Sequence, residues 1–484
     1  MASKFLQIFR PFISIVPEVK KPARAFSHRE RIRWTLLAFV AYAIMSSIPL
    51  IGIDIGEVDP FHFLRVITAS IYGTLTELGI SAILSGGLFL LILRGLNILK
   101  INQEDPEERA LYNCAFKVLA ILITIIEASL LLIGGTFGTG LSLYSQSILL
   151  LQLVVAGVVI IYLDEILTKG WGYGSGIALF IVGGVAIQIF MGLFAVQVLF
   201  EGPNDVLSNR GIILAFLSWI STEGLPEAIG MLFFRYSPDS DHHLNLPSLS
   251  IFTLINTIVF IFLFNYIGAL KIRANNRNNN KGEIPSNSMI DIMNRLTIPV
   301  LLTYTLFANF FFVAEFVWNV SGREGAANLL ANILGIFTLD TASQQLVPTG
   351  GIILFLTPPQ FLIATVLTDP MGAVFRCLTY GFLFVSTVLF FLVIMTRIEG
   401  GILIGDGKKL FNHGFSELPE PAEIKDRNNS QKGTIPGFLV HWGIFIASII
   451  VIGDLLGVLG SSVGLFLSVS FLKQYFTIKT EKRA

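Results

Sequence analysis

Long apolar runs recur along the whole chain, separated by charged clusters and by breaks that contain Pro or Gly. Most runs have roughly 20 residues, the length that a helix needs to cross a hydrocarbon core about 30 Å thick. The pattern therefore predicts an all-α polytopic membrane protein with ten transmembrane helices, near residues 34–53, 78–99, 113–134, 143–164, 175–200, 248–270, 298–320, 373–396, 435–453 and 455–476.

The basic residues predict the orientation of these spans. With ten crossings both termini share one side, and that side then holds 28 of the 33 Lys and Arg. Because basic residues are retained in the cytoplasm, we expect both termini there, with residues 477–484 as a short tail. Residues 1–33 hold too many basic residues for a cleavable signal. Their apolar positions before Pro17 indicate a short helix that lies in the interface plane.

Composition agrees with a lipid environment and narrows the chemistry. The chain is 53% hydrophobic and 14% charged, whereas a soluble domain carries about 25% charged residues. The two cysteines, Cys114 and Cys377, lie in apolar runs without a second Cys or His at ligand spacing. We therefore expect no disulfide framework, no metal site and no cofactor.

The long connections differ between the two sides. Two basic loops, 271–297 and 397–434, are expected beside the termini. They are either solvated loops retained by their charge or a docking surface for a polyanion such as ribosomal RNA, contacted through its phosphates. The candidate docking residues are Lys271, Arg273, Arg277, Lys281, Lys408, Lys409 and Lys425. The opposite side has the connections 201–247 and 321–372, and the second is rich in turn residues, as suits an external cap.

Five sequence blocks, in chain order, are distinctive together. They are RVITASIYGTLTELGIS at 65–81, LDEILTKGWGYGSGIALFI at 163–181, IPVLLTYTLFANF at 298–310, PTGGIILFLTPP at 348–359 with Asp369–Pro370, and GDLLGVLGSSVGLFLSVSFLKQYF at 453–476. On the expected ten-span topology, these blocks resemble the SecY family, the pore subunit of the protein translocon, on its archaeal–eukaryotic branch. The resemblance extends from about Ile15 to Phe476.

The resemblance implies both a fold and a function. Two halves of five helices, residues 34–200 and 248–476, would form an inverted repeat around an hourglass pore, with 201–247 as the hinge connection. The chain would pass unfolded polypeptides across a membrane and release transmembrane segments sideways into lipid. The implied partners are SecE/gamma-type and beta-type small membrane subunits, the ribosome, signal-sequence-bearing nascent polypeptides and membrane lipid. An archaeal plasma membrane is preferred, and the endoplasmic reticulum applies if the chain is eukaryotic.

A narrow aliphatic constriction suits such a channel. An apolar neck dewets when it is closed and so disfavours ions, and it offers passing side chains no fixed hydrogen bonds. The resemblance carries the family's pore-ring positions to six residues, all aliphatic: Ile80, Leu84, Ile177, Ile181, Leu301 and Leu467. From the residues alone, ordinary packing is the alternative for each of them.

The segment at about 59–75 resembles the family's plug. Asp59 and Pro60 open it, and we expect a short amphipathic helix that ends near Gly73. The segment is too polar to span a membrane, so it would be re-entrant, where backbone need not face lipid. A plain external loop is the alternative. The candidate plug residues are Phe61, Leu64, Arg65, Ile67, Thr68 and Ser70.

Sideways release requires a seam between the second and seventh spans. The family's polar gate positions match Ser85, Glu127 and Asn309, with Leu91 where the family commonly has Gln. Polar groups within a bilayer are usually functional, and interhelical hydrogen bonds contribute only about 1 kcal/mol each, which suits a seam that opens. Alternatively, Glu127 simply pairs with a neighbouring helix for stability.

The basic loops depart from the family pattern. Lys271 is followed by Ile272 and Arg273 without the family's acidic run, and the family's Gly-Phe-Arg appears as Gly414, Phe415 and Ser416. Docking could then fall to other lysines of the second loop or be weaker, as in a divergent paralogue.

Two other classes of protein compete with a channel. A secondary transporter would share the spans and orientation, but it needs converging carboxylates at the midplane, and Glu127 is the clearest acidic residue within a span. An intramembrane enzyme would need a nucleophile such as Ser175, but the surrounding GYGSG does not form the G-x-S-x-G elbow. We therefore expect a protein that is not an enzyme.

Overall fold

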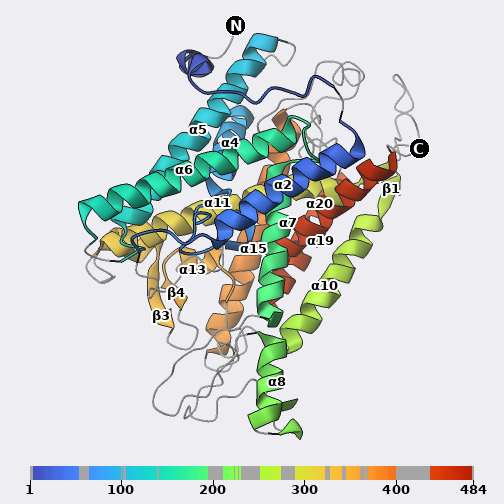
Figure 1. The fold of residues 1–484 in the computed structure, drawn as a ribbon. Helices are drawn as coiled ribbons and strands as arrows, with labels where there is room; N and C mark the ends of the chain where they lie inside the picture. Colours follow the sequence, from blue (N-terminus) through green and yellow to red (C-terminus); the bar gives the residue numbers. More distant parts are fainter. Residues whose placement is uncertain are drawn as a thin grey trace.

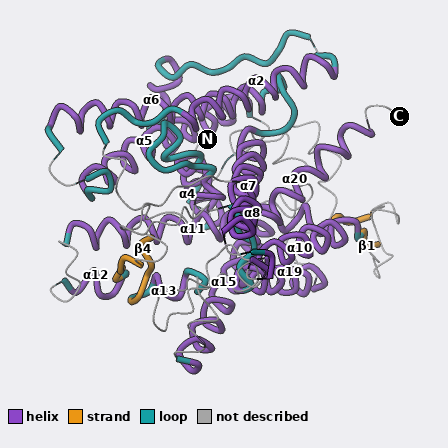
Figure 2. The backbone as a smooth tube through the Cα atoms, turned by 60° about the horizontal axis from the view of Figure 1, so that its bottom comes forward, coloured by secondary structure: helices purple, strands orange, loops and turns teal. Residues whose placement is uncertain are grey.

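The computed structural model is a bundle of long helices that cross at varied angles (Figure 1). Figure 2 shows the same chain from a second direction and separates the helices from the short strands and loops. The structure describes residues 4–24, 26–53, 65–96, 98–99, 101, 105–138, 141–194, 211–222, 224–226, 228–229, 251–273, 289–321, 328–340, 345–359, 366, 369–398 and 437–481.

Each of the ten predicted spans coincides with a helix. These helices are α2 (His28–Ser47), α4 (Ser81–Gly95), α5 (Pro106–Ile133), α6 (Leu143–Thr168), α7 (Gly176–Phe194), α10 (Ile251–Ala269), α11 (Ile292–Val320), α15 (Pro370–Ile398), α19 (Gly437–Leu455) and α20 (Ser462–Glu481). Within the described residues, α5, α6, α7, α10, α11 and α15 are long and apolar enough to cross a membrane, and α4 and α19 are shorter apolar helices. The predicted all-α membrane architecture is confirmed.

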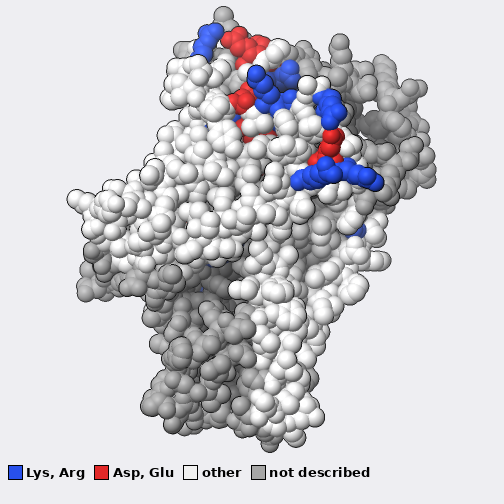
Figure 3. All heavy atoms as spheres, viewed as in Figure 1, with Lys and Arg blue, Asp and Glu red and all other residues white. Residues whose placement is uncertain are grey.

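Charged side chains gather at one end of the molecule. Figure 3 shows Lys, Arg, Asp and Glu at the top of the described surface, over a broad face nearly free of charge. The N-terminal helix α1 (Lys4–Gln7) and the C-terminal end of α20 lie toward this end in Figure 1. We call it the charged end and define it by residues 4–24, the start of α2 and residues 169–173. The uncharged face beyond it has the character of a surface in contact with lipid.

Capping side chains and turns shift several helix boundaries from their predicted places. Helix α2 starts at His28 rather than 34, because Ser27 and Glu30 form a capping box there. It ends at Ser47 rather than 53, since Ile48 precedes Pro49 and is disfavoured in a helix. Helix α20 starts at Ser462 rather than 455, because glycines with positive φ form the preceding turn.

The connections contain short elements of their own. Strands β1 (Lys271–Arg273) and β2 (Met289–Asp291) pair antiparallel, as do β3 (Ile336–Asp340) and β4 (Gln345–Gly350). Helix α8 (Ile212–Thr222) lies in the predicted hinge connection, and α12 (Leu329–Leu334) and α13 (Ile353–Leu356) flank the second hairpin. Phe337 of β3 packs on Phe311 and Trp318 of α11, at ring-centroid distances of 5.3 and 5.5 Å. The hairpin is therefore attached to α11.

The N-terminal segment is clamped onto α5 and α6. It forms α1 and a 3-10 turn, η1 (Arg10–Ser14), so the helical part of the expectation is confirmed. Lys117 of α5 pairs with Glu165 of α6 at 2.8 Å, and both side chains are more than nine-tenths buried. Lys117 also donates to the carbonyl of Pro17 at 2.8 Å, and Glu165 accepts from the amide of Val19 at 3.2 Å. One buried ion pair thus joins two helices and the N-terminal segment.

Removing one partner of this pair should destabilise the protein strongly. Lys117→Met leaves the Glu165 carboxylate buried without its cation, which costs about 3–5 kcal/mol. The melting temperature of the purified chain in detergent should fall, and protease should cut the segment before Val19 faster. The matched control is Arg10→Met, because the Arg10–Glu107 pair at 3.0 Å is largely exposed. Equal losses in both variants would contradict the clamp.

Candidate functional site

The six aliphatic residues predicted to form a pore ring lie on or at the start of four helices, and all are buried. Each side chain is at most 2% exposed, and all belong to one contiguous apolar cluster: Ile80 and Leu84 at the start of α4, Ile177 and Ile181 on α7, Leu301 on α11 and Leu467 on α20. Figure 2 shows these four helices grouped in the centre of the molecule. Burial also fits ordinary packing, so the ring itself stays a prediction.

Different contacts join the four helices. Helices α11 and α20 are joined by a hydrogen bond of 2.6 Å between the hydroxyls of Thr297 and Ser470. Helices α7 and α20 run antiparallel, since Tyr173, just before α7, contacts Tyr475 near the end of α20, at a ring-centroid distance of 5.3 Å. Helices α4 and α11 are joined by the polar contact described below.

A one-turn helix, α3 (Arg65–Thr68), lies against the start of α4. The amide of Ile80, which precedes α4, donates to the carbonyl of Thr68 at 2.7 Å. Gly79 has φ +53°, and a Cβ there would lie 2.0 Å from the same carbonyl oxygen, so only glycine fits. The backbone of α3 therefore touches the first predicted ring residue directly.

Helix α3 also packs into a recess lined by glycines of α7 and α20. A Cβ added at Gly184 would lie 3.3 Å from the carbonyl oxygen of Val66, and one at Gly464 would lie 2.8 Å from the Val66 side chain. Glycine at both positions lets α3 approach the two helix backbones closely. We call Gly184 and Gly464 the glycine recess.

A buried ion pair closes the loop that follows α3. A guanidinium nitrogen of Arg65 lies 2.7 Å from a carboxylate oxygen of Glu77, and the two side chains are 5% and 1% exposed. The second Glu77 oxygen accepts from the amide of Gly73 at 2.7 Å, and Arg65 also donates to the hydroxyl of Ser70 at 3.3 Å. The segment from Arg65 to Ile80 is thus tied to itself as well as to α4.

The predicted end of the plug helix is wrong. We expected it to end near Gly73, but it ends at Thr68 because Ala69 adopts φ +50° and breaks the helix. Arg65, Ile67, Thr68 and Ser70 are placed as described, whereas Phe61 and Leu64 lie outside the described residues. The re-entrant position of the segment stays a prediction.

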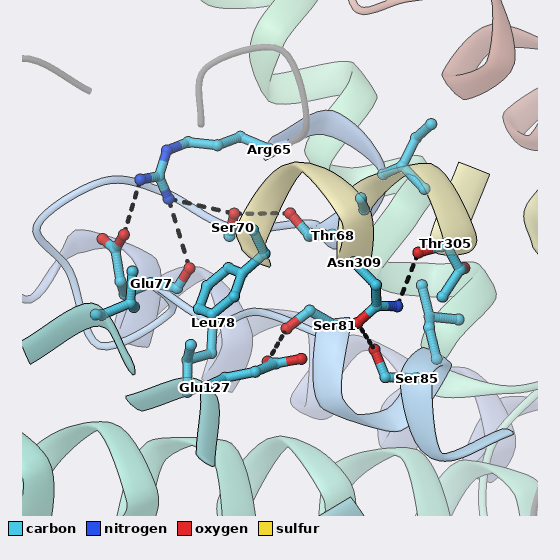
Figure 4. Close-up of a pocket in the computed structure, with 15 residues that line it drawn as sticks. Arg65, Thr68, Ser70, Glu77, Leu78, Ser81, Ser85, Glu127, Thr305 and Asn309 are labelled. Carbon is cyan, nitrogen blue, oxygen red and sulfur yellow. Dashed lines mark hydrogen bonds and ion pairs between the residues drawn. The ribbon is translucent and has the colours of Figure 1, made fainter. Parts of the chain in front are cut away.

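The polar contact between α4 and α11 is the one expected at the seam. The hydroxyl of Ser85 donates to the side-chain oxygen of Asn309 at 3.1 Å. The amide nitrogen of Asn309 donates to the carbonyl of Thr305 one turn earlier, at 2.8 Å, which turns its oxygen toward Ser85 (Figure 4). Leu91 is buried farther along α4. A single neutral hydrogen bond thus links the two helices here.

Glu127 lies beside this contact, but its bond does not cross between α4 and α11. It accepts a hydrogen bond of 2.5 Å from the hydroxyl of Ser81, so it ties α5 to the first residue of α4. Ser81 was not among the predicted site residues. The sequence feature that could have pointed to it is its position one helical turn before Ser85, which puts both serines on the same face of the helix. Figure 4 shows the Ser81–Glu127 and Ser85–Asn309 bonds next to each other.

A small cavity lies between α3 and these helices. Its volume is about 50 Å³, which is enough for water. Its lining includes Arg65, Thr68, Ser70 and Glu77 from the α3 segment, Ser81, Leu84 and Ser85 from α4, Glu127 from α5, and Thr305 and Asn309 from α11. The α3 segment and the polar contact between α4 and α11 therefore border the same space.

Most of the candidate docking residues cannot be placed. Lys271 and Arg273 form the two ends of β1. Arg277, Lys281, Lys408, Lys409 and Lys425 lie outside the described residues. Ser175 has a structural role, because its hydroxyl accepts from the amide of Ala178 at 3.2 Å and so caps α7.

Comparison with known proteins gives one consistent result. The SecY family model matches residues 74–476, and the model of the plug domain of Sec61p matches residues 40–73. The chain is 29% identical over 483 residues to the protein transport protein Sec61 subunit alpha of Dictyostelium discoideum, covering 98% of this chain and 96% of that protein.

Two solved structures share the fold. One is titled as the structure of a protein conducting channel, with a TM-score of 0.71 and 23% identity. The other is Sec61 in the canine ribosome-channel complex from the endoplasmic reticulum, with a TM-score of 0.70 and 23% identity. Each similarity covers 98% of this chain and 97% of the other.

Filling the glycine recess should loosen α3. In Gly464→Ala, the new methyl group would lie 2.8 Å from the Val66 side chain and must displace it, at a cost of about 1–3 kcal/mol. A cysteine at Thr68, in a chain with Cys114 and Cys377 replaced by Ala, should then react faster with a maleimide. The control is Gly381→Ala on α15, whose nearest neighbour would be at an ordinary 3.4 Å. Equal reaction rates would contradict the recess.

Proposed function

The chain belongs to the SecY family, and on that premise we propose that its aliphatic ring, α3 plug and α4–α11 seam pass unfolded polypeptides through a membrane and release transmembrane segments sideways into lipid. Its general function, a channel for protein transport, follows from the family and decides against a solute transporter. The observation that carries the detailed proposal is the ring: six aliphatic side chains from four helices, each at most 2% exposed.

The ring would act as the seal. Water leaves a narrow apolar neck, and an ion that entered it would lose its hydration without gaining a ligand. An aliphatic wall also lacks hydrogen-bonding groups, so polar and apolar side chains of a passing polypeptide both slide along it. This chemistry depends on the size and apolarity of the side chains rather than on any one reactive group.

The plug would provide a second barrier. Helix α3 fills the glycine recess on α7 and α20 and touches the ring at Ile80. Its described helical part is a single turn, held by the buried Arg65, Val66 and Ile67. A short element of this kind can leave its place without unfolding the helices around it.

The seam would open between α4 and α11. Ser85 and Asn309 share one neutral hydrogen bond, and such bonds between transmembrane helices contribute about 0.6 kcal/mol on average. A transmembrane segment that enters between α4 and α11 would replace their contact with each other by contact with its own apolar surface. The Ser81–Glu127 bond stays within the first half of the chain, so opening need not break it.

Location and partners follow the same reasoning. The chain is an integral membrane protein, and we propose that its charged end, with both termini, is cytoplasmic, since basic residues are retained there. A structural relative is part of a ribosome-channel complex, so we propose that this end meets the ribosome, with the basic loops 271–297 and 397–434 as the contact. Small SecE/gamma-type and beta-type subunits and signal-sequence-bearing nascent polypeptides are proposed as further partners.

Three further parts of the sequence prediction also stay predictions. They are the choice of an archaeal plasma membrane over the endoplasmic reticulum, the division into halves at 34–200 and 248–476, and the absence of catalytic activity. The last is supported by the family, which is one of protein translocation channels.

Polar substitutions in the ring should make the resting channel leak. In Ile181→Asn with Leu301→Asn, water can wet the neck, so its barrier to ions falls. Resting conductance in planar bilayers should rise on the order of tenfold, the effect of a barrier lowered by about 1.4 kcal/mol. The control is Ile181→Leu with Leu301→Ile, which keeps both side chains aliphatic and of the same size. Its resting conductance should match that of the native protein. Unchanged conductance in the Asn variant would remove these residues from the seal.

Locking the seam should separate translocation from membrane insertion. Cysteines at Ser85 and Asn309 should be crosslinked by a short bismaleimide in the resting channel, because the native side chains are 3.1 Å apart. The crosslinked protein should no longer release transmembrane segments into lipid. A pair at Ile92 and Asn309 is the control, since Ile92 lies two turns, about 10 Å, along α4 from Ser85. If both pairs crosslink equally, or insertion continues, the proposed gate is wrong.

A further inference from the structure

The helix α7 begins with a set of hydrogen bonds that includes a distant carboxylate. Ser175 precedes the helix, and its hydroxyl accepts from the amide of Ala178 at 3.2 Å. Asp164 of α6 is 2% exposed, and its carboxylate accepts from the amide of Ile177 at 3.1 Å. A Cβ at Gly176 would lie 2.6 Å from the Asp164 Cα, so glycine is what allows the two helices to meet here.

The helix α20 begins in a similar way, although its carboxylate bonds the first amide of the helix rather than the second, and the serine before it has φ +59°. Ser461 precedes it, and its hydroxyl accepts from the amide of Gly464 at 3.1 Å. Asp454 of α19 accepts from the amide of Ser462 at 2.8 Å, and its other oxygen accepts from the hydroxyl of Tyr380 on α15 at 2.9 Å. Again a serine and a carboxylate from the preceding long helix share the first turn.

The two helix starts match in further details. Each serine follows a glycine with positive φ, +69° at Gly174 and +74° at Gly460. The carbonyl of each serine accepts the amide four residues later, at 3.2 Å from Leu179 and 3.1 Å from Leu465. The spacing between aspartate and serine differs, so a search for identical strings does not detect the match.

The matching starts lie at opposite ends of the molecule. Helix α7 begins at the charged end, beside Tyr173, and α20 ends there with Tyr475, so α20 begins at the other end. The helices are the fifth and tenth spans, the last of each set of five. In an inverted repeat, corresponding helices of the two halves run in opposite directions. Similar caps at the starts of α7 and α20 fit such a relation.

The ring residues keep a constant distance from these caps. Ile181 lies six residues after Ser175, and Leu467 lies six residues after Ser461. At 1.5 Å per residue, both side chains are about 9 Å along the axis from the start of their helix. Because the helices enter from opposite ends, the two caps together determine whether Ile181 and Leu467 meet at the same depth.

The caps have the chemistry to hold the helices in place. The first amides of a helix have no partner within it, and the helix dipole favours a negative group beside them. Asp164 is 2% exposed, so the buried amide of Ile177 has few replacement partners if it loses this carboxylate. A helix could otherwise slide along aliphatic neighbours at little energetic cost.

We propose that Asp164 and Asp454 are a matched pair of positioning residues, one in each half of the chain, which fix the starts of α7 and α20 and so align Ile181 with Leu467 at one depth. This role rests on the proposed ring. It is a role in alignment, and neither carboxylate would touch the translocating polypeptide.

The test compares an Ala and an Asn variant of the full-length channel at each aspartate, with Tyr380→Phe as a third variant beside Asp454. Asp164→Ala and Asp454→Ala remove the acceptor, whereas Asp164→Asn and Asp454→Asn keep an oxygen that can accept the amide hydrogen. Tyr380→Phe removes a contact of Asp454 but leaves its bond to α20. Two readouts are needed: hydrogen–deuterium exchange of the first turns of α7 and α20, and resting conductance in planar bilayers.

The Ala variants should speed exchange in the first turn of the affected helix by about tenfold and raise resting conductance severalfold. The Asn variants and Tyr380→Phe should stay within about twofold of the native protein in both readouts. Should an Ala variant fail to accumulate, Ser175→Ala and Ser461→Ala weaken the same caps and should show the same changes to a smaller degree.

Two results would overturn the proposal: Ala variants, or their Ser→Ala substitutes, that match the native protein, or Asn variants that leak as much as Ala. The two readouts also separate this inference from the proposed function. Suppose that hydrogen exchange increases in the Ala variants but their conductance does not. If the double variant Ile181→Asn with Leu301→Asn also shows no rise in conductance, the proposed ring is wrong. If the double Asn variant of the ring raises resting conductance but the Ala variants of the two aspartates do not, the proposed alignment role of the caps is wrong.

Discussion

Aliphatic side chains can exclude ions only while they touch, yet they supply no directional bond that would keep them touching. The proposed ring of this protein would therefore depend on contacts outside it to hold four helices in register. Those contacts differ around the ring. Ser85 and Asn309 join α4 to α11, Thr297 and Ser470 join α11 to α20, and close packing at Gly464 joins α20 to α7.

These contacts also differ in strength, which gives the channel a direction in which to open. The α7–α20 side combines close packing, the Tyr173–Tyr475 contact and two capped helix starts. On the α4–α11 side, the described residues Ser85 and Asn309 share a neutral hydrogen bond between side chains. A guest that separates the helices would then meet the least resistance at α4–α11, and the opposite side would act as the hinge. Because α3 touches Ile80 and borders the cavity beside Ser85, we expect movement of the proposed seam to be coupled to release of the proposed plug.

The sequence predicted the spans well because a lipid solvent demands long apolar runs, and it predicted Ser85 and Asn309 through the family pattern. Helix boundaries were predicted less well, since they depend on local caps such as Ser27 with Glu30 and on turns such as the one before Ser462. The extent of the plug helix depended on the backbone of Ala69, a residue whose type gives no warning of a positive φ.

Other features depend on tertiary contacts and have no signal in a single sequence. Glu127 was expected at the seam, but its bond to Ser81 could be seen only when α5 was placed against α4. The paired roles of Asp164 and Asp454 appear only when each is seen beside the helix that follows it. Polar residues that bond within one half, and those that bond across the two halves, look alike in a sequence.

The most direct test of a dry ring is its accessibility to a water-borne reagent. A single cysteine at Ile181, in a chain with Cys114 and Cys377 replaced by Ala, would be exposed to a charged, membrane-impermeant thiol reagent from each side. A dry ring gives no reaction from either side in the resting channel and rapid reaction once a polypeptide is stalled in the pore. Rapid reaction at rest, or none with a polypeptide in place, would contradict it.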